Sequence, residues 1–91
     1  MRNEIKQKLI ALLAIKEDEF INVDIANFNG VVIIQLANIR YKEIMSKIVD
    51  IDSILGETLE ADILDTMINI SYPLVDDTNA LRVVIHFSFE N

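Results

Sequence analysis

Residues 21–36 have the sequence INVDIANFNGVVIIQL, in which two runs rich in β-branched residues flank the dipeptide Asn29-Gly30. Asn-Gly between alternating apolar residues is the strongest short-range signal of a β-hairpin, because a type I′ turn needs positive φ at both central residues. A two-residue loop at this point places Phe28 opposite Val31. The sequence therefore predicts two antiparallel strands joined by a tight turn.

The predicted hairpin sorts its side chains onto two faces, and its register places Val23 opposite Leu36. The face predicted to join the core carries Val23, Ile25, Val32, Ile34 and Leu36. The other face carries, near the turn, Ala26, Phe28, Val31 and Ile33. Because this second face is more apolar than a solvated sheet surface needs to be, we expect a helix or another copy of the chain to cover it. Phe28, Val31 and Ile33 are the candidate residues of a homodimer interface.

Helices are predicted on either side of this hairpin. Apolar residues recur at helical spacing over residues 3–17 and again over residues 39–50, which indicates two amphipathic helices. Residues 53–66 fit two interpretations. Leu59, Ile63, Leu64 and Met67 suit a short helix, whereas residues 58–63 alternate as a strand does; the helix is favoured.

The C-terminal part of the chain alternates between apolar and polar residues over 68–74 and again over 81–89. These two segments predict a second hairpin with a polar turn over residues 75–80, its apolar side facing the same core. The predicted order is α-β-β-α-(α)-β-β. We expect a single α+β domain over residues 1–91, with two or three helices packed on a mostly antiparallel sheet of about four strands.

Composition and charge exclude several classes of function. The chain has no cysteine, which removes disulfides and thiolate chemistry and fits a reducing cytoplasm. The longest apolar run, residues 9–15, is far shorter than the roughly 20 residues of a membrane-spanning helix. A net charge of −7 argues against direct binding to nucleic acid or to an anionic membrane.

The residues that would carry catalysis are sparse. With two glycines in the chain, no phosphate-binding loop of the familiar kinds can be written. His86 is the single histidine and is predicted on the outer side of the last strand, where neither Ser71 nor Ser88 sits on a nucleophile elbow. We therefore expect a protein that is not an enzyme and needs no cofactor.

One short motif resembles a site for a hard cation. Asp50 and Asp52 are followed by Glu57, and clustered carboxylates are the ligands that calcium and magnesium select. The EF-hand pattern, counted from Asp50, requires Gly and Glu where this chain has Leu55 and Ala61. No metal site is predicted.

Charge is distributed unevenly along the chain. Residues 1–47 carry seven basic and six acidic side chains, whereas residues 48–91 carry one basic and nine acidic. Eight of the acidic residues lie between Lys47 and Arg82 with no cation among them, namely Asp50, Asp52, Glu57, Glu60, Asp62, Asp65, Asp76 and Asp77. They either solvate an ordinary surface or form a binding surface for a cationic protein.

Carboxylates every few ångströms along a helix or strand are comparable to the phosphates of one DNA strand, which repeat at about 3.4 Å. In size, acidity and Ile- and Asn-rich composition the chain is similar to phage-encoded anti-CRISPR and anti-restriction inhibitors. The resemblance implies a nucleic-acid mimic that blocks a basic nucleic-acid-binding enzyme. The alternative hypothesis is a small homo-oligomeric structural or adaptor protein that uses the apolar outer face of the first hairpin.

Overall fold

The computed structural model describes residues 2–71 and 80–90. Three α-helices, one short 3₁₀ helix and four strands follow one another in the predicted order α-β-β-α-α-β-β. The elements are α1 (Arg2–Leu13), β1 (Phe20–Ala26), β2 (Asn29–Ala37), η1 (Asn38–Arg40), α2 (Tyr41–Ser46), α3 (Ile48–Leu59), β3 (Asp62–Ser71) and β4 (Ala80–Glu90). The predicted α+β class is confirmed.

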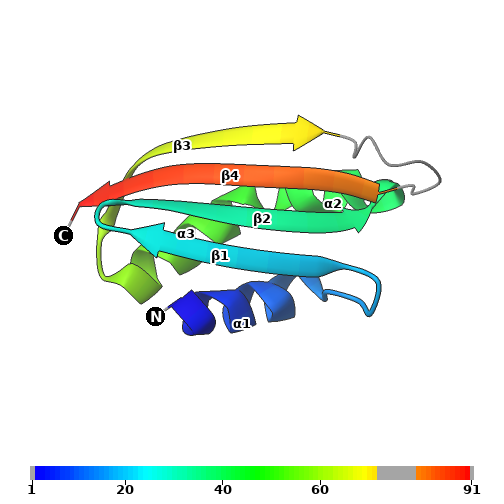
Figure 1. Cartoon of the computed structure of the whole chain (residues 1–91), viewed down its shortest axis with the longest axis horizontal. Helices are drawn as coiled ribbons and strands as arrows, with labels where there is room; N and C mark the ends of the chain where they lie inside the picture. Colours follow the sequence, from blue (N-terminus) through cyan, green and yellow to red (C-terminus); the bar gives the residue numbers. More distant parts are fainter. Residues whose placement is uncertain (1, 72–79, 91) are drawn as a thin grey trace.

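The four strands form one antiparallel sheet in the order β1-β2-β4-β3. Figure 1 shows the helices on one side of this sheet, with α3 running behind the central strands and α1 beside β1. The molecule therefore has two layers. The face of the sheet that points away from the helices has no helix over it in the described part of the chain.

The core lies between the sheet and the helices. Helix α1 contributes Ile5, Leu9 and Leu13, which recur every four residues and are fully buried. Helix α3 presents a second buried stripe with the same spacing. Every second residue of β4 from Leu81 to Phe89 is buried, because successive strand side chains point to opposite faces. The predicted core face of the second hairpin is confirmed for this strand.

The first hairpin has the predicted faces but not the predicted register. Val23 pairs with Val32 instead of Leu36, and the two-residue loop is Asn27-Phe28, not Asn29-Gly30. The shift in pairing is an even number of residues, so the side chains that remain within the strands stay on their predicted faces, whereas Phe28 moves into the turn. Asn27 supplies the positive φ that the turn needs, at 45°. Asparagine tolerates that conformation better than most residues.

Gly30 has a different role from the one that the Asn-Gly signal suggested. It pairs with Phe87 across the β2–β4 ladder, and a Cβ added at Gly30 would overlap three atoms of the Phe87 ring. Its φ is not positive. The glycine is therefore required for the close approach of an aromatic ring and not for the turn.

The helices differ from the predicted ranges at their ends. Helix α1 stops at Leu13 instead of residue 17, because Ala14 has a positive φ of 48°. The helix predicted over 39–50 is split at Lys47 into α2 and α3. Residues 75–79 of the predicted polar turn and residues 72–74 of the preceding predicted strand lie outside the described residues.

Residues 53–66 are partly helix and partly strand, so the favoured helical interpretation is wrong beyond Leu59. Glu60 ends α3 in the left-handed conformation, with φ 53°, and Ala61 N–H donates to the Gly56 carbonyl at 3.1 Å. This arrangement stops the helix and turns the chain back. Ile63, Leu64 and Met67 then belong to β3, which pairs with β4 from Asp62 onward.

Candidate functional site

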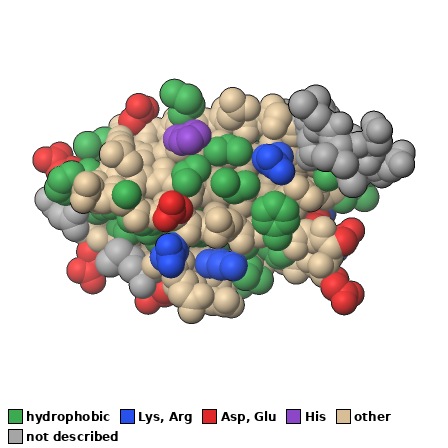
Figure 2. All heavy atoms as spheres, in the orientation of Figure 1, with side chains coloured by type: hydrophobic (Ala, Val, Ile, Leu, Met, Phe, Trp, Pro, Cys, Tyr) green, Lys and Arg blue, Asp and Glu red, His purple; other side chains and the backbone are tan. Residues whose placement is uncertain are grey.

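The uncovered face of the sheet is the broadest candidate surface, and we call it the open face. Strand pairing aligns its outward-pointing residues in four rows across β1, β2, β4 and β3. The rows are Phe20-Gln35-Arg82-Ser71, Asn22-Ile33-Val84-Asn69, Asp24-Val31-His86-Met67 and Ala26-Asn29-Ser88-Asp65. Figure 2 shows this face with apolar side chains gathered at its middle.

The centre of the open face is apolar. Val31, Ile33 and Val84 are half-buried by one another and by their neighbours, whereas Met67 is 65% exposed and Phe20 is 43% exposed. An antiparallel sheet that faces water normally alternates apolar residues inward with polar residues outward. The central positions break that pattern, while Asn, Gln and Ser occupy half of the twelve positions around Val31, Ile33, Val84 and Met67.

Few charges lie on the open face. Asp24 is on the edge strand β1, and its carboxylate lies 3.6 Å from the Arg2 guanidinium of α1. Asp65 is on β3 at one end of the face, and Arg82 is on β4 at the other. Two carboxylates and one guanidinium therefore occupy a surface of sixteen residues. The excess negative charge of the chain lies elsewhere.

Phe28 does not share this face with Val31 and Ile33. It lies in the turn between β1 and β2, is 61% exposed, and its ring packs edge-on against the buried Phe89 with centroids 6.4 Å apart. Its carbonyl accepts a hydrogen bond from Phe89 N–H at 2.9 Å. Of the three residues predicted for an oligomer interface, the structure places Val31 and Ile33 together and separates Phe28 from them.

A shallow hollow of about 410 Å³ on the open face brings Asp65, His86 and Ser88 together beside Met67. Ser88 lies opposite Asp65, and His86 is two residues from Ser88 on the same side of β4. Among the described residues no hydrogen bond joins these three side chains, whereas a serine nucleophile is activated through a hydrogen bond to its base. These three side chains are therefore not arranged as a catalytic triad, and the hollow forms the polar edge of the apolar centre.

The predicted acidic residues are divided among several locations. Asp50 and Glu57, seven residues apart, lie on one exposed side of α3, and the exposed Glu60 directly follows the helix. Asp62 starts β3 opposite Glu90 of β4. Glu57, Glu60, Asp62 and Glu90 surround a second hollow of about 230 Å³, and we call these four residues the acidic corner. Glu90 was absent from the predicted set because only strand pairing brings it there.

The other predicted carboxylates are not part of this corner. Asp52 is half-buried and accepts a hydrogen bond from the Thr66 hydroxyl at 3.3 Å. Asp65 belongs to the open face, and residues 76 and 77 lie outside the described part of the chain. Lys8 of α1 reaches Thr58 of α3 at 3.2 Å, so the fold places a cation beside the acidic residues of α3, among which the linear sequence has none.

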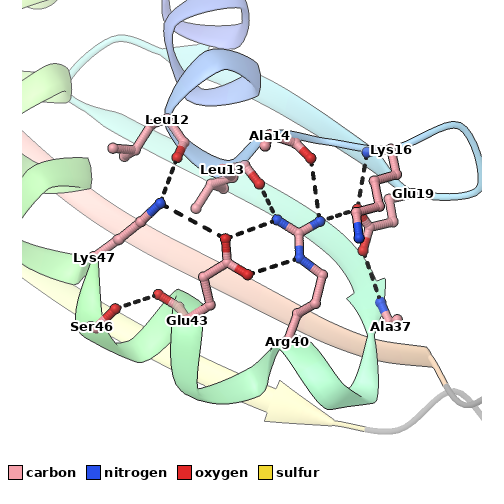
Figure 3. Close-up of polar contacts among 10 residues, drawn as sticks. All are labelled: Leu12, Leu13, Ala14, Lys16, Glu19, Ala37, Arg40, Glu43, Ser46 and Lys47. Atoms are coloured by element: carbon pink, nitrogen blue, oxygen red, sulfur yellow. Dashed lines mark hydrogen bonds and ion pairs between the residues drawn. The ribbon is translucent and has the colours of Figure 1, made fainter.

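A buried polar cluster that the sequence analysis missed joins the end of α1, the loop before β1, the end of β2, η1 and α2 (Figure 3). Arg40 is 6% exposed and Glu19 is 8% exposed, and their side chains are ion-paired. The Glu19 carboxylate also accepts from the backbone N–H of Lys16 at 3.0 Å and of Ala37 at 3.1 Å. Arg40 donates to both carboxylate oxygens of Glu43, at 3.1 and 3.2 Å.

The cluster also completes the C-terminus of α1. The last four carbonyls of a helix lack intrahelical partners. Here the carbonyls of Leu12 and Leu13 accept from Lys47 and Arg40 respectively. Those of Ile10 and Ala11 accept from backbone N–H groups. Cations at the C-terminus of a helix also interact favourably with the helix dipole. All the hydrogen-bonding groups of Arg40 and Glu19 are thus used within the fold.

The contact between Arg40 and Glu43 changes both ionisation equilibria. The hydrogen bond to Glu43 holds the pKa of Arg40 above its ordinary value against the opposing effect of burial. The same hydrogen bond lowers the pKa of Glu43 below its ordinary value. Both groups are therefore charged at neutral pH, and the cluster is a structural tie between α1 and α2.

Residues 2–71 and 80–90 contain neither a cluster of metal ligands nor a membrane-spanning helix. No three His, Asp or Glu side chains in these ranges are grouped as a metal ion would require. Asp50 and Asp52 lie on different sides of α3. None of the helices in the same ranges combines the length and apolar content needed to cross a membrane.

Comparison of the chain with protein-family models, with curated proteins and with solved structures gives no match. The structure itself defines the class: an α+β domain with three helices on one face of a four-stranded antiparallel sheet. Function has to be argued from its surfaces.

Proposed function

We propose that this chain is a non-enzymatic protein-binding module that acts in the cytoplasm and uses the open face of its sheet as the contact surface. The observation that carries the proposal is the apolar centre formed by Val31, Ile33 and Val84, with the exposed Met67 beside it. Contiguous exposed apolar surface of this kind on a small domain is typical of an interaction site.

The arrangement of the face suits recognition of another protein. An apolar centre supplies hydrophobic free energy of about 25 cal/mol per Å² buried. The surrounding Asn, Gln and Ser side chains can hydrogen-bond at the rim, which is the usual anatomy of a protein interface. The rigid two-layer fold holds these side chains in place, so little ordering is required on binding.

Site-specific photo-crosslinking in cells of the source organism tests this proposal. A photoreactive phenylalanine analogue replaces Val84 at the centre of the open face, and a control chain carries it at Gln7, an exposed position of α1. We expect protein adducts from position 84 and none from position 7. A folded chain that gives no adduct from position 84 contradicts the proposal, whatever the partner.

The acidic corner supports a second candidate function, inhibition of a nucleic-acid-binding enzyme by mimicry. Glu57, Glu60, Asp62 and Glu90 converge on one hollow. Asp50 continues the same charge along α3, about 10 Å from Glu57 at 1.5 Å per residue. A negative surface of this kind would enter a cationic groove and accelerate association by long-range attraction.

A charge-matched pair of variants tests the second candidate. One variant removes three charges of the acidic corner (Glu57→Gln, Glu60→Gln, Glu90→Gln). The control removes the same charge from exposed positions outside both the corner and the open face (Glu4→Gln, Glu17→Gln, Asp18→Asn). Wild type and control should capture a basic nucleic-acid-binding protein from nuclease-treated lysate and release it as salt rises, whereas the corner variant should not. Equal capture by both variants would exclude the corner as the contact.

A further inference from the structure

We propose that the open face binds the open face of a second copy of this chain, related by a two-fold axis that runs across the strands between the second and third rows. This inference rests on the proposed function, since it names the occupant of the same surface. Two sheets packed in this way keep their strands roughly aligned, as in β-sandwiches.

The charges on the face select this axis. The axis places the first row of one copy over the fourth row of the other, so Arg82 lies over Ser88 of the partner subunit, one strand from the partner's Asp65. Within one chain these two residues are three rows apart, about 20 Å at the normal rise of a strand. The long arginine side chain therefore reaches a carboxylate of the second copy, and the symmetry forms the pair twice.

The other in-plane two-fold axis, parallel to the strands, is less favourable. It places Arg82 over Gln35 of the partner subunit and Asp65 over the partner's Ala26. Each copy would then desolvate a guanidinium without a carboxylate beside it. Because such burial is costly, the first arrangement is preferred.

The uncharged positions also match across the first axis. Ile33 lies over Val31 of the partner subunit, and Phe20 lies over the partner's Ala26. Val84 lies over the partner's His86 at the margin of the apolar centre. Large side chains thus face small or medium ones, as interdigitating sheets require.

Net charge and area favour a second copy as the occupant. The whole chain carries −7, but the open face carries two carboxylates and one guanidinium, and Arg2 lies beside one of the carboxylates. Two like-charged copies can therefore meet here with little repulsion. Four strands about 4.8 Å apart and four rows about 6.7 Å apart span roughly 500 Å² per copy. The pair therefore buries roughly 1,000 Å², the lower limit for a specific interface.

Sedimentation velocity over 1–500 μM tests the pairing by charge exchange. Arg82→Asp and Asp65→Arg alone should each weaken the dimer at least tenfold, and the double variant should restore it, because the exchanged pair forms again between copies. Ile33→Asp should give a folded monomer by circular dichroism. Its control, Val49→Asp, changes an apolar residue that is 76% exposed on α3 and should leave the dimer unchanged.

Methionine oxidation of the unmodified chain is a measurement that needs no variant. Met67 is 65% exposed on the open face, and Met45 is 40% exposed on α2. Oxidation of Met67 should slow as protein concentration rises through the range of dimer formation, and oxidation of Met45 should not.

Three outcomes would overturn the inference: a wild type that stays monomeric at 500 μM, a dimer that survives Ile33→Asp, or a double charge variant no tighter than the single ones. In the first case, adducts from position 84 with a different protein would still uphold the open face as a binding surface. If the wild type stays monomeric at 500 μM and position 84 also gives no adduct, the proposed function is refuted as well.

Discussion

Replacing Arg40 with methionine should remove a large part of the stability of this domain. The guanidinium is buried, pairs with the buried carboxylate of Glu19, and donates to the carbonyls of Leu13 and Ala14 at the end of α1. Methionine keeps an unbranched apolar side chain in the same space, so the main change is loss of the charge and its hydrogen bonds. Glu19 is then left as a buried carboxylate without its cation.

The magnitude follows from the burial of the pair. Removing one partner of a buried ion pair costs about 3–5 kcal/mol, because the remaining charge is desolvated and uncompensated. Two backbone N–H groups still donate to Glu19, at 3.0 and 3.1 Å, so we expect the lower part of that range, about 3 kcal/mol. A 91-residue domain has a free energy of unfolding of about 5–14 kcal/mol. The Arg40→Met variant is therefore expected to be only marginally stable.

Urea denaturation followed by circular dichroism measures this effect, and a double variant tests its cause. Arg40→Met with Glu19→Gln removes the stranded charge and should be more stable than Arg40→Met alone by at least about 1 kcal/mol. A loss below about 1 kcal/mol for Arg40→Met would refute the reasoning. A double variant that is no more stable than Arg40→Met would do so too.

Three further predictions concern local features. The pKa of Glu43 is lowered in the folded state, so its contribution to stability is present above its ordinary pKa and is lost as pH falls through the folded value. The urea midpoint of the wild type should therefore fall as pH drops below about 4.5, and in Glu43→Gln this fall should be smaller. Gly30→Ala should destabilise the fold by about 1–3 kcal/mol through overlap with the Phe87 ring, and Phe87→Leu in the same chain should recover part of that loss in thermal melts. Asn27→Gly should be close to neutral and Asn27→Val destabilising in the same melts, because the turn holds Asn27 at positive φ; equal effects of both changes would be inconsistent with the observed turn.

The sequence predicted those parts of the fold that depend on local periodicity. The buried stripe of α1 and the alternating faces of β2 and β4 follow directly from spacing. The register of the first hairpin does not, because Asn27-Phe28 and Asn29-Gly30 are both plausible two-residue loops that leave the same residues inward. The observed register places Gly30 beside the ring of Phe87, a contact with a residue far along the chain that the sequence of the hairpin does not reveal.

The same limit explains the ambiguity over residues 53–66. The apolar residues at 59, 63, 64 and 67 have helical spacing, but Ile63 and Met67 pair with Phe89 and His86 of β4. Nothing within the segment itself reveals that the last strand of the chain will form a ladder with it. Long-range pairing overrides the local pattern here.

The candidate surfaces were only partly predictable for a related reason. Apolar residues at 31 and 33 indicated an unusual outer face, but Val84 and Met67 join them only through the strand order β1-β2-β4-β3. In the buried cluster, the spacing of Arg40, Glu43 and Lys47 as i, i+3 and i+7 was a usable signal of a shared helical side. The partner of this group, Glu19, lies in a run of four charged residues that does not distinguish it.

Two residues of the acidic corner, Glu57 and Glu60, are separate enough from the open face to act independently of it. Asp62 and Glu90 pair just beyond Asp65 and Ser88, so they border the fourth row of the face. Glu57 and Glu60 lie at the end of α3, in the helix layer, which the proposed two-fold axis keeps outside the contact. Replacing Glu57 and Glu60 with Gln should therefore leave the sedimentation of the dimer unchanged, and Ile33→Asp should leave the salt-dependent capture of a cationic partner by each monomer intact. A dimer weakened by these two Gln substitutions would mean that the two copies do not meet through the open face.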